Sequence, residues 1–374
     1  MGIEAGLFVG TRPSLIMAAP IVRAIDAAGI DLQLVHTGQH YSDNMDKIFF
    51  EELMLREPDV RFARSEGSAG PARQIADILV GAEDWLISEK PKIVLALGDT
   101  NSNFAAAVAA CKHGVPVWHI EAGERAFDMA SPEEQNRVMI DHISVLNLCT
   151  NEKSRKNLLQ EGIDQSRIAV VGNPIVDSLI KNLDRAENAG FDDPELLACI
   201  DAPFWIMTLH RQETVDDKTL LAAVLAGLAD QARKHGCRII FPMHPRTFSN
   251  AKKFGLLTKL TEMPEFLIKP GLGYLQFISL LRRAEICLTD SGGVQQEAAI
   301  LSVPTVTVMD STPWPETVDE GVNTLAPPST ETNWSQPISY ALNRKRRDGI
   351  WDGFGDGHTG EKIAQLLKRH LQTG

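Results

Sequence analysis

The chain has 374 residues, more than a single hydrophobic core usually organises, so we expect two domains. Hydrophobic residues make up 44% of it and charged residues 23%, which are ordinary values for a soluble globular protein. The formal net charge of −12 argues against a nucleic-acid partner, and it means that an anionic ligand must be held by local dipoles and a few placed cations.

Cysteine usage and the length of the apolar runs indicate a cytoplasmic protein without a membrane partner. The five cysteines lie far apart without a C-x-x-C pair, and most sit in apolar surroundings typical of buried, reduced thiols. No apolar run approaches the ~18 residues that cross a bilayer, and the N-terminus lacks the pattern of a signal peptide. The one dense basic run, residues 344–347, is interpreted as a solvated loop or helix end.

Short apolar runs alternate with loops and helical stretches along the whole chain. A first series of predicted strands covers residues 6–10, 32–36, 92–97, 116–120, 145–149 and 168–171. A second series covers residues 204–209, 238–242, 286–289 and 305–309. Strands that are apolar on both faces suit parallel sheets covered by helices on each side, so the pattern predicts an α/β protein with two doubly wound, Rossmann-like domains.

The domain limits follow from the breaks between and after these series. A turn at residues 172–174 precedes the charged stretch 181–194, and this is the best candidate boundary. The glycine-rich residues 353–358 then precede an amphipathic helix at 359–372. We therefore expect an N-terminal domain at residues 1–175, a C-terminal domain at 176–355 and a final helical segment at 356–374.

Polar residues follow the predicted strands at six places. Ligands of open α/β sheets bind at the carboxyl ends of the strands, so six such loops in two domains predict a cleft between the domains. The loops are Gly10-Thr11-Arg12-Pro13, Gly98-Asp99-Thr100, His119-Ile120-Glu121-Ala122-Gly123, His210-Arg211, His244-Pro245-Arg246 and Asp290-Ser291-Gly292-Gly293.

The loop that begins at Asp290 is the most informative. Its two glycines let the backbone approach a ligand just before a helix begins, and the N–H groups of a helix start attract an anion such as a diphosphate. Glu297, about one turn into the helix, is placed to accept hydrogen bonds from ribose hydroxyls. The alternative is an ordinary turn in which Ser291 caps the helix and Glu297 is an acid favoured by the helix dipole.

Two further side chains suit an anionic ligand. Arg12 follows the first strand at a predicted helix start, where a guanidinium can bind phosphate oxygens; the alternative is a surface arginine. His210 follows the first strand of the second series, where it fits a phosphate or a leaving group, although a lone histidine is more often structural.

Carboxylates at the ends of buried strands suit acid–base work better than stability. Asp99 and Glu121 hold such positions on neighbouring predicted strands. Glu133 and Glu134 fall in the first turn of a predicted helix, and the alternative role of a surface acid that stabilises the helix dipole is strong for Glu134 and weaker for Glu133. Because no H-x-x-H spacing is present, we expect no metal.

Seven motifs occur in a fixed order along nearly the whole chain: Gly10-Thr11-Arg12-Pro13, His36-Thr37-Gly38-Gln39-His40, Gly98-Asp99-Thr100, His119-Ile120-Glu121-Ala122-Gly123, Pro132-Glu133-Glu134-x-Asn136-Arg137, His210-Arg211 and Asp290-Ser291-Gly292-Gly293. Together they resemble the non-hydrolysing UDP-N-acetylglucosamine 2-epimerases. The resemblance implies the two-domain glycosyltransferase-B fold, a final helix that crosses back onto the first domain, and a homodimer.

The resemblance also implies a reaction. Members of the family invert carbon 2 of a UDP-2-acetamido sugar: the C2 proton and UDP leave to give a 2-acetamidoglucal, and UDP adds again with a proton on the opposite face. No cofactor and no metal take part. By similarity the catalytic residues are Asp99, Glu121, Glu133 and His210, and the substrate-binding residues are Arg12, Arg137, His244, Ser291, Gly292, Gly293 and Glu297. Gln39 and His40 match a loop that contributes to an allosteric UDP-sugar site in bacterial members.

The chain departs from the family pattern at several positions. Ser14 and Met17 stand where an acid and then a lysine or arginine are common, so one cation is missing. Glu124 replaces the usual apolar residue after Glu-Ala-Gly and adds a carboxylate beside Glu121. Residues 98–102 and 125–128 resemble members that act on other UDP-2-acetamido sugars, such as the 6-deoxy-talose to fucosamine step, so the identity of the sugar stays open.

Three other functions are compatible with these motifs. One is a hydrolysing relative that releases N-acetylmannosamine and UDP, another is a glycosyltransferase of the same fold, and the third is a non-catalytic UDP-sugar-binding homologue. The retention of Asp99, Glu121, Glu133 and His210 argues against the non-catalytic homologue.

Overall fold

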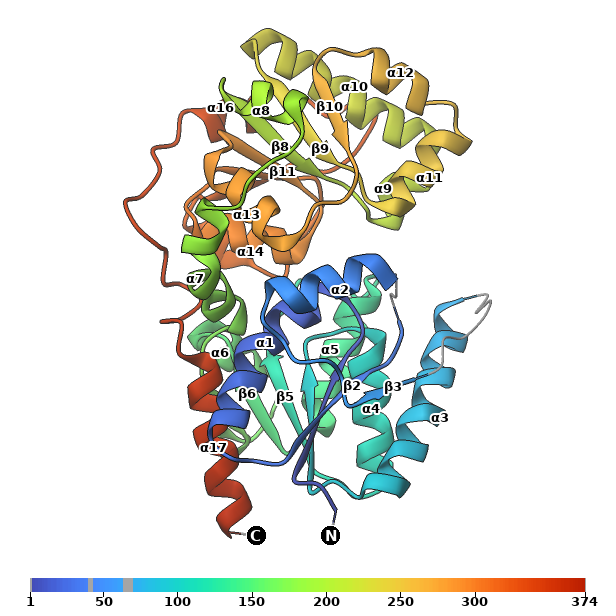
Figure 1. Cartoon of the computed structure of the whole chain (residues 1–374), viewed down its shortest axis with the longest axis vertical. Coiled ribbons are helices and arrows are strands. Elements are labelled where there is room, and N and C mark those ends of the chain that lie inside the picture. Colours follow the sequence, from blue (N-terminus) through green and yellow to red (C-terminus); the bar gives the residue numbers. More distant parts are fainter. Residues whose placement is uncertain (1, 40–42, 63–69, 374) are drawn as a thin grey trace. The chain divides into compact units, whose positions relative to one another are not determined.

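The computed structural model describes residues 2–39, 43–62 and 70–373, and the chain divides into two compact units (Figure 1). Unit 1 comprises Met1–Lys181 and Phe354–Gly374, and unit 2 comprises Asn182–Gly353. Helix α7 (Pro174–Glu187) contains the first limit between the units.

Within the described residues, unit 1 forms a seven-stranded parallel sheet in the order β3-β2-β1-β4-β5-β6-β7. Its strands are β1 (Ala5–Val9), β2 (Leu32–His36), β3 (Val60–Arg61), β4 (Ile93–Leu97), β5 (Val117–Ala122), β6 (Leu146–Cys149) and β7 (Ile168–Val170). Between them come α1 (Arg12–Ala27), α2 (Asp43–Glu52), α3 (Pro71–Glu89), α4 (Asn101–Lys112), α5 (Pro132–Ile143), α6 (Glu152–Gln160) and the 3₁₀ turn η1 (Gln165–Arg167).

Unit 2 has, in its described part, a six-stranded parallel sheet in the order β10-β9-β8-β11-β12-β13. Its strands are β8 (Phe204–Thr208), β9 (Arg238–Pro242), β10 (Phe266–Lys269), β11 (Ile286–Thr289), β12 (Thr305–Thr307) and β13 (Asn323–Leu325). Its helices after α7 are α8 (Pro194–Ile200), α9 (Gln212–Val215), α10 (Lys218–His235), α11 (Pro245–Lys253), α12 (Leu257–Glu262), α13 (Tyr274–Arg283), α14 (Gly292–Ile300), α15 (Pro315–Asp319) and α16 (Ser335–Leu342).

The predicted class of two Rossmann-like parallel sheets is confirmed, but three strands were not predicted. These are β3, β10 and β13, and each lies at an edge of its sheet. An edge strand pairs on one side only and is often short, so it needs no long apolar run. β3 has two residues and β13 has three, which is too short for a periodic pattern to show.

The strand order reverses at one place in each sheet, between β1 and β4 in unit 1 and between β8 and β11 in unit 2. Doubly wound sheets bind ligands at the carboxyl ends of the strands beside this switch point. Arg12 follows β1, Asp99 follows β4, His210 follows β8 and Ser291 follows β11. The sequence motifs therefore lie where the topology of each sheet favours a ligand.

Apolar side chains fill the space between sheet and helices, and two glycines make room for tryptophans. In unit 1, Trp85 packs edge-on against Phe8 with 5.1 Å between the ring centroids. A Cβ on Gly6 would lie only 2.2 Å from the Trp85 ring. In unit 2, a Cβ on Gly227 would lie 2.3 Å from the ring of Trp334. Glycine is therefore required at both positions by close packing.

The final helix α17 (Thr359–Thr373) belongs to unit 1, where it packs against α1 (Figure 1). A Cβ on Gly360 would lie 2.6 Å from the Pro20 carbonyl oxygen of α1. The Gly360 N–H donates a hydrogen bond to Asp177 Oδ1 at 2.9 Å, and the Asn173 N–H donates to the Phe354 carbonyl at 2.7 Å. The expected return of the last helix to the first domain is thus confirmed.

Cys149, Cys199, Cys237 and Cys287 are buried, as predicted, and burial raises the pKa of each thiol. Cys111 is exposed near the end of α4. None of the helices in the described ranges combines the length and the hydrophobicity needed to cross a membrane.

Candidate active site

Asp99 lies in the turn after β4, where two residues of α5 hold it. Gly98 has the left-handed φ of 73° that lets the chain turn here. The Asp99 carboxylate is 28% exposed and forms an ion pair with Arg137, and Asn136 Nδ2 donates to the Asp99 carbonyl at 2.9 Å. The position of the Asp99 loop therefore depends on α5.

Arg137 connects Asp99 to a second carboxylate, that of Glu134, whose Oε2 lies 2.9 Å from Arg137 Nη1. Burial works to lower the pKa of Arg137, but Asp99, Glu134 and Glu121 outweigh it and raise this pKa. The interpretation of Glu134 as a surface acid is wrong: it is 1% exposed. Its carboxylate accepts hydrogen bonds from the N–H groups of Ala126 and Phe127 at 3.0 and 2.9 Å, so it fixes the loop before α5.

Glu121 lies at an irregularity near the end of β5, where the pairing with β6 shifts between Ile120 and Ala122. Its φ of 71° is a left-handed conformation that side chains other than glycine rarely adopt. A Cβ placed on Gly98 would lie 3.1 Å from Glu121 Oε2, so this carboxylate reaches the turn that carries Asp99.

One contact of Glu121 is not predicted by the sequence motifs. Asn173 Nδ2 donates to Glu121 Oε1 at 2.9 Å from a fully buried position before α7. The sequence Gly-Asn-Pro indicates only a turn at a domain boundary. An asparagine directly after a predicted strand is the signal that could have found it, because the other site residues share that position.

Glu133 is exposed in the first turn of α5, where its Oε2 accepts a hydrogen bond from Ser131 Oγ at 2.9 Å. It precedes Arg137 by four residues, so both lie on the same face of the helix. The structure thus brings Asp99, Glu121 and Arg137 together and places Glu133 one helical turn from Arg137.

The departures at Ser14, Met17 and Glu124 have structural explanations. Ser14 Oγ accepts hydrogen bonds from the N–H groups of Gly10 and Thr11 at 3.1 and 3.0 Å, which is the capping-box role of the more common acid. A Cβ placed on Gly98 would lie 3.6 Å from the Met17 methyl. Met17 therefore places an apolar group beside the same turn that Glu121 borders. Glu124 is buried and accepts a hydrogen bond from Ser154 Oγ at 2.7 Å, which directs it to α6.

Arg12 begins α1, directly after the Thr11 cap. Its guanidinium carbon lies 5.7 Å from the centre of the Phe49 ring, a cation–π geometry that orients the side chain. Arg12 as a whole is half-buried.

Gln39 lies beside the start of α4. Its Oε1 accepts hydrogen bonds from the N–H and the Oγ of Ser102 at 3.0 and 2.6 Å, so it supports the first turn of that helix. His40, the other residue of the expected allosteric loop, lies outside the described residues.

In unit 2, His210 pairs with Asp290 across the switch point. His210 Nδ1 lies 2.9 Å from Asp290 Oδ1, and Asp290 Oδ2 accepts from the N–H groups of His210 and Arg211 at 2.7 and 2.8 Å. Burial of Asp290 tends to raise its pKa, but His210 and the two N–H groups lower it overall. The His210 side chain is 39% exposed, so it is oriented by a buried anion and still open to a ligand.

His244 lies near His210, with 5.4 Å between the ring centroids. It caps α11, because its Nδ1 accepts a hydrogen bond from the Arg246 N–H at 3.2 Å.

Ser291 is the N-terminal cap of helix α14. Its Oγ accepts a hydrogen bond from the Val294 N–H at 3.5 Å. Among the described residues, no atom lies within 4 Å of a Cβ placed on Gly293, and a Cβ on Gly292 would lie 3.3 Å from the indole nitrogen of Trp314. Space is therefore open beside Gly293, and residues 291–294 are partly exposed, which suits the approach of an anion to a helix start.

Glu297 is only 3% exposed, and burial raises its pKa to about 8, although a hydrogen bond with Tyr274 works in the other direction. Glu297 is therefore a buried carboxylate of α14. In the part of the chain that the structure describes, no group of three or more His, Cys, Asp or Glu side chains is arranged to hold a metal ion.

Two parallel Rossmann-like units, each with polar groups at its switch point, define the glycosyltransferase-B class of fold. A solved structure of this class is that of Methanocaldococcus jannaschii UDP-GlcNAc 2-epimerase in complex with UDP-GlcNAc and UDP. It matches with a TM-score of 0.90 and 41% sequence identity, over 98% of this chain and 100% of that chain.

The sequence comparisons agree with the structural one. The family model described as UDP-N-acetylglucosamine 2-epimerase matches residues 23–368. A Methanocaldococcus jannaschii protein of that name is 42% identical over 98% of this chain and 99% of its own length. A Pseudomonas aeruginosa protein named UDP-2,3-diacetamido-2,3-dideoxy-D-glucuronate 2-epimerase is 36% identical over 96% and 98%. The chain belongs to the UDP-N-acetylglucosamine 2-epimerase family, which confirms the resemblance of its motifs.

Proposed function

We propose that this protein is an isomerase that inverts carbon 2 of a UDP-2-acetamido sugar by anti elimination of UDP and re-addition. The observation that carries the proposal is the cluster of Asp99, Glu121 and Arg137 beside the switch point of unit 1, in a chain of this family. Inversion of a carbon through proton transfer needs acid–base groups rather than a redox cofactor or a metal.

The two carboxylates suit the two proton transfers. Asp99 and Glu121 both border Gly98 but come from different strands. Asp99 forms an ion pair with Arg137, whereas Glu121 accepts a hydrogen bond from the Asn173 amide and interacts with Arg137 electrostatically. Carboxylates in unlike surroundings can act as acid and base in one reaction. We assign them to removal and return of the C2 proton, with Glu133 as a third acid–base candidate on the face of α5 that carries Arg137.

Departure of UDP requires stabilisation of a diphosphate. We assign this role to the α14 start at Ser291, Gly292 and Gly293, with His210 and His244 of the same unit as partners. On the resemblance to the family, Arg12 and Arg137 of unit 1 are further candidates for diphosphate binding. Because the ribose of UDP presents hydroxyl donors, Glu297 is assigned to the ribose. This site uses N–H groups and a helix dipole, which bind an anion without a high positive charge on the protein.

The substrate class is a UDP-2-acetamido sugar, and UDP-N-acetylglucosamine is the first substrate to test because two similar proteins carry that name. The name of the Pseudomonas aeruginosa relative, which refers to a UDP-diacetamido uronate, supports testing a second sugar in parallel. We also propose a cytoplasmic homodimer that serves polysaccharide biosynthesis, on the resemblance to the family. Light scattering of the purified protein tests the dimer.

Incubation with each UDP-sugar in deuterated water, followed by proton NMR, tests the proposed reaction. Deuterium at C2 together with an intact UDP-sugar of inverted configuration is expected. Free N-acetylmannosamine with UDP would instead indicate a hydrolysing enzyme. Absence of C2 exchange with every UDP-2-acetamido sugar would contradict catalysis and favour a UDP-sugar-binding homologue.

The variant Glu121→Gln tests the acid–base assignment. It keeps the size of the side chain but cannot exchange a proton, so C2 exchange should fall by about 10² to 10⁴ while UDP affinity is unchanged. Glu152→Gln, on an exposed carboxylate of α6, is the matched control and should behave like the wild type. Normal turnover of Glu121→Gln would show that Glu121 is not a catalytic residue.

A further inference from the structure

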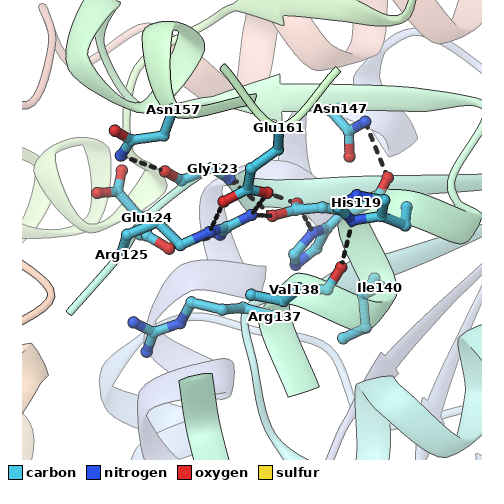
Figure 2. A network of polar contacts seen from close by, with 12 residues as sticks. His119, Gly123, Glu124, Arg125, Arg137, Val138, Ile140, Asn147, Asn157 and Glu161 are labelled. Atoms are coloured by element: carbon cyan, nitrogen blue, oxygen red, sulfur yellow. Dashed lines mark hydrogen bonds and ion pairs between the residues drawn. The ribbon is translucent and has the colours of Figure 1, made fainter. Parts of the chain in front are cut away.

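Figure 2 shows a buried network of polar and charged side chains that includes His119, Gly123 and Arg125. Through Gly98 and Gly123 it contacts both loops that carry the candidate acid–base residues. At its centre is Asp141 of α5, which is 0% exposed. Asp141 Oδ1 lies 2.6 Å from His119 Nδ1, and Asp141 Oδ2 lies 2.7 Å from Arg125 Nη2. Desolvation of such charges is costly, and none of the three has a part in the proposed reaction.

One arm of the network reaches the Asp99 loop. His119 Nε2 lies 3.1 Å from the carbonyl oxygen of Gly98, the residue before Asp99. The Gly98 N–H in turn donates to the Ile120 carbonyl at 3.0 Å. The peptide that leads into Asp99 is therefore held on both sides by β5.

The other arm reaches the Glu121 loop. The Gly123 N–H lies 3.3 Å from each carboxylate oxygen of Asp141, and Asn157 Nδ2 donates to the Gly123 carbonyl at 2.9 Å. Glu121 and Gly123 have φ angles of 71° and 80°. A left-handed glutamate persists only where its surroundings fix it, and Asp141 supplies such a fixed point two residues away.

Every polar atom at the centre of the network faces a partner. The two ring nitrogens of His119 face oxygen atoms, one of Asp141 and one of the Gly98 carbonyl. Arg125 also binds Glu161, at 2.7 Å from Nε to Oε1 and 2.6 Å from Nη2 to Oε2. Arg125 thus pairs with both Asp141 and Glu161, and these contacts together with those of His119 make the network a rigid anchor.

We infer that His119 and Asp141 are positioning residues that set the Asp99 loop and the Glu121 loop relative to each other. The inference rests on the proposed function, because it concerns the two carboxylates assigned to proton transfer. A displacement of about 1 Å at such groups can cost about 10² in rate. The pair should therefore control turnover without contact with the substrate.

The variants for the test are Asp141→Asn, His119→Asn and His119→Gln, with Glu161→Gln as the control. In Asp141→Asn, one of the two carboxylate oxygens becomes an NH₂ group, which is a donor. That group then faces His119 or Arg125 and cannot accept the hydrogen bond that the oxygen accepted. An asparagine at 119 can still reach Asp141 but is too short for the Gly98 carbonyl, whereas a glutamine reaches the position of Nε2. Glu161 belongs to the same network but contacts neither loop.

Turnover in the C2 exchange assay should fall about 10- to 100-fold in Asp141→Asn and His119→Asn, with KM and UDP affinity unchanged. His119→Gln should recover part of that loss. Glu161→Gln should lose stability but keep its turnover number. Hydrogen–deuterium exchange of backbone amides should become faster at residues 97–101 and 120–124 in the first two variants and remain unchanged there in the control.

Wild-type turnover per folded molecule in Asp141→Asn and His119→Asn would overturn the inference, as would an equal loss in Glu161→Gln. A rise in KM with normal turnover would overturn it too. If the wild type exchanges no C2 proton, the proposed function fails, and the amide exchange still decides whether the network orders the loops. Unchanged amide exchange at both segments would refute the positioning role on its own.

Discussion

Asp141 in unit 1 and Glu297 in unit 2 are both buried carboxylates beside candidate sites, but burial has opposite outcomes for them. His119 and Arg125 lower the pKa of Asp141 although desolvation tends to raise it. For Glu297, desolvation dominates over the hydrogen bond with Tyr274 and raises the pKa to about 8.

The difference agrees with the roles that we propose for the two regions. In the proposed reaction, unit 1 holds acid–base carboxylates in fixed positions, and the ion pair of Asp141 with Arg125 suits that role. Unit 2 binds the diphosphate in this proposal, and it offers a helix start, glycines and a buried carboxylate with a raised pKa. The following predictions test this contrast, beginning with the largest expected effect.

Removal of Arg125 should make Asp141 resemble Glu297. In Arg125→Met, Asp141 and Glu161 lose their shared cation, and the free energy of unfolding should fall by about 3–5 kcal/mol near neutral pH. The deficit should shrink at about pH 5, because Asp141 then keeps only His119 as a pKa-lowering partner and takes up a proton more readily in the folded state. Urea denaturation at the two pH values measures this.

Arg155→Met is the control for that variant. Arg155 forms a partly exposed pair with Glu152 at 3.1 Å, and its loss should change stability by less than about 1 kcal/mol. An equal deficit for Arg125→Met at both pH values would show that lost packing, rather than uncompensated charge, causes the effect.

Glu297 should make the protein less stable as the pH rises. Between the ordinary glutamate pKa of about 4.3 and the folded value of about 8, the folded state holds a proton that the unfolded state has released. Folding stability from this group is therefore fully present below about pH 4 and is lost by about pH 8, a change of a few kcal/mol. Asp141 and Asp290 have lowered pKa values, so their contributions are lost instead as the pH falls below about 4.

Thermal unfolding across this pH range distinguishes the groups. Glu297→Gln should flatten the decline between about pH 5 and pH 8, because glutamine does not titrate. Glu262→Gln, on an exposed glutamate of α12, should leave the wild-type slope in place. The same slope in Glu297→Gln and the wild type would contradict a raised pKa at Glu297.

Binding of UDP-N-acetylglucosamine near neutral pH should release part of a proton from Glu297. Ribose hydroxyls that donate to the carboxylate favour its ionised form and so lower its pKa. Calorimetric titration in buffers of different ionisation enthalpy measures the release, which should be absent in Glu297→Gln. Equal release in both proteins would assign the proton to another group, such as His210.

The smallest effects are expected at the helix caps. Ser14 accepts two short backbone hydrogen bonds, so Ser14→Ala should reduce the free energy of unfolding by about 1 kcal/mol. Ser291 lies 3.5 Å from the Val294 nitrogen, so Ser291→Ala should reduce stability less but weaken UDP binding. Urea denaturation and calorimetric titration separate the two outcomes, and a larger stability loss at Ser291 would reverse the contrast.

The sequence by itself determined the two parallel sheets and the loops that hold the candidate site. Apolar runs of strand length, helical stretches and glycine-rich turns are local patterns, and they follow from backbone geometry and burial over a few neighbouring residues. For the same reason the amino-acid order alone locates the helix start at Gly292 and the carboxylates of Asp99 and Glu121 at the ends of strands.

Only the tertiary structure decided which neighbours these residues have. Glu134, which was expected to be a surface acid, is buried, and Glu133 is exposed. Asn173 contacts Glu121 although the two are 52 positions apart in the chain. His119 contacts Asp141 and so connects the two loops. Such contacts depend on how strands and helices are placed in three dimensions, and a local pattern carries no information about a partner that lies far away in the sequence.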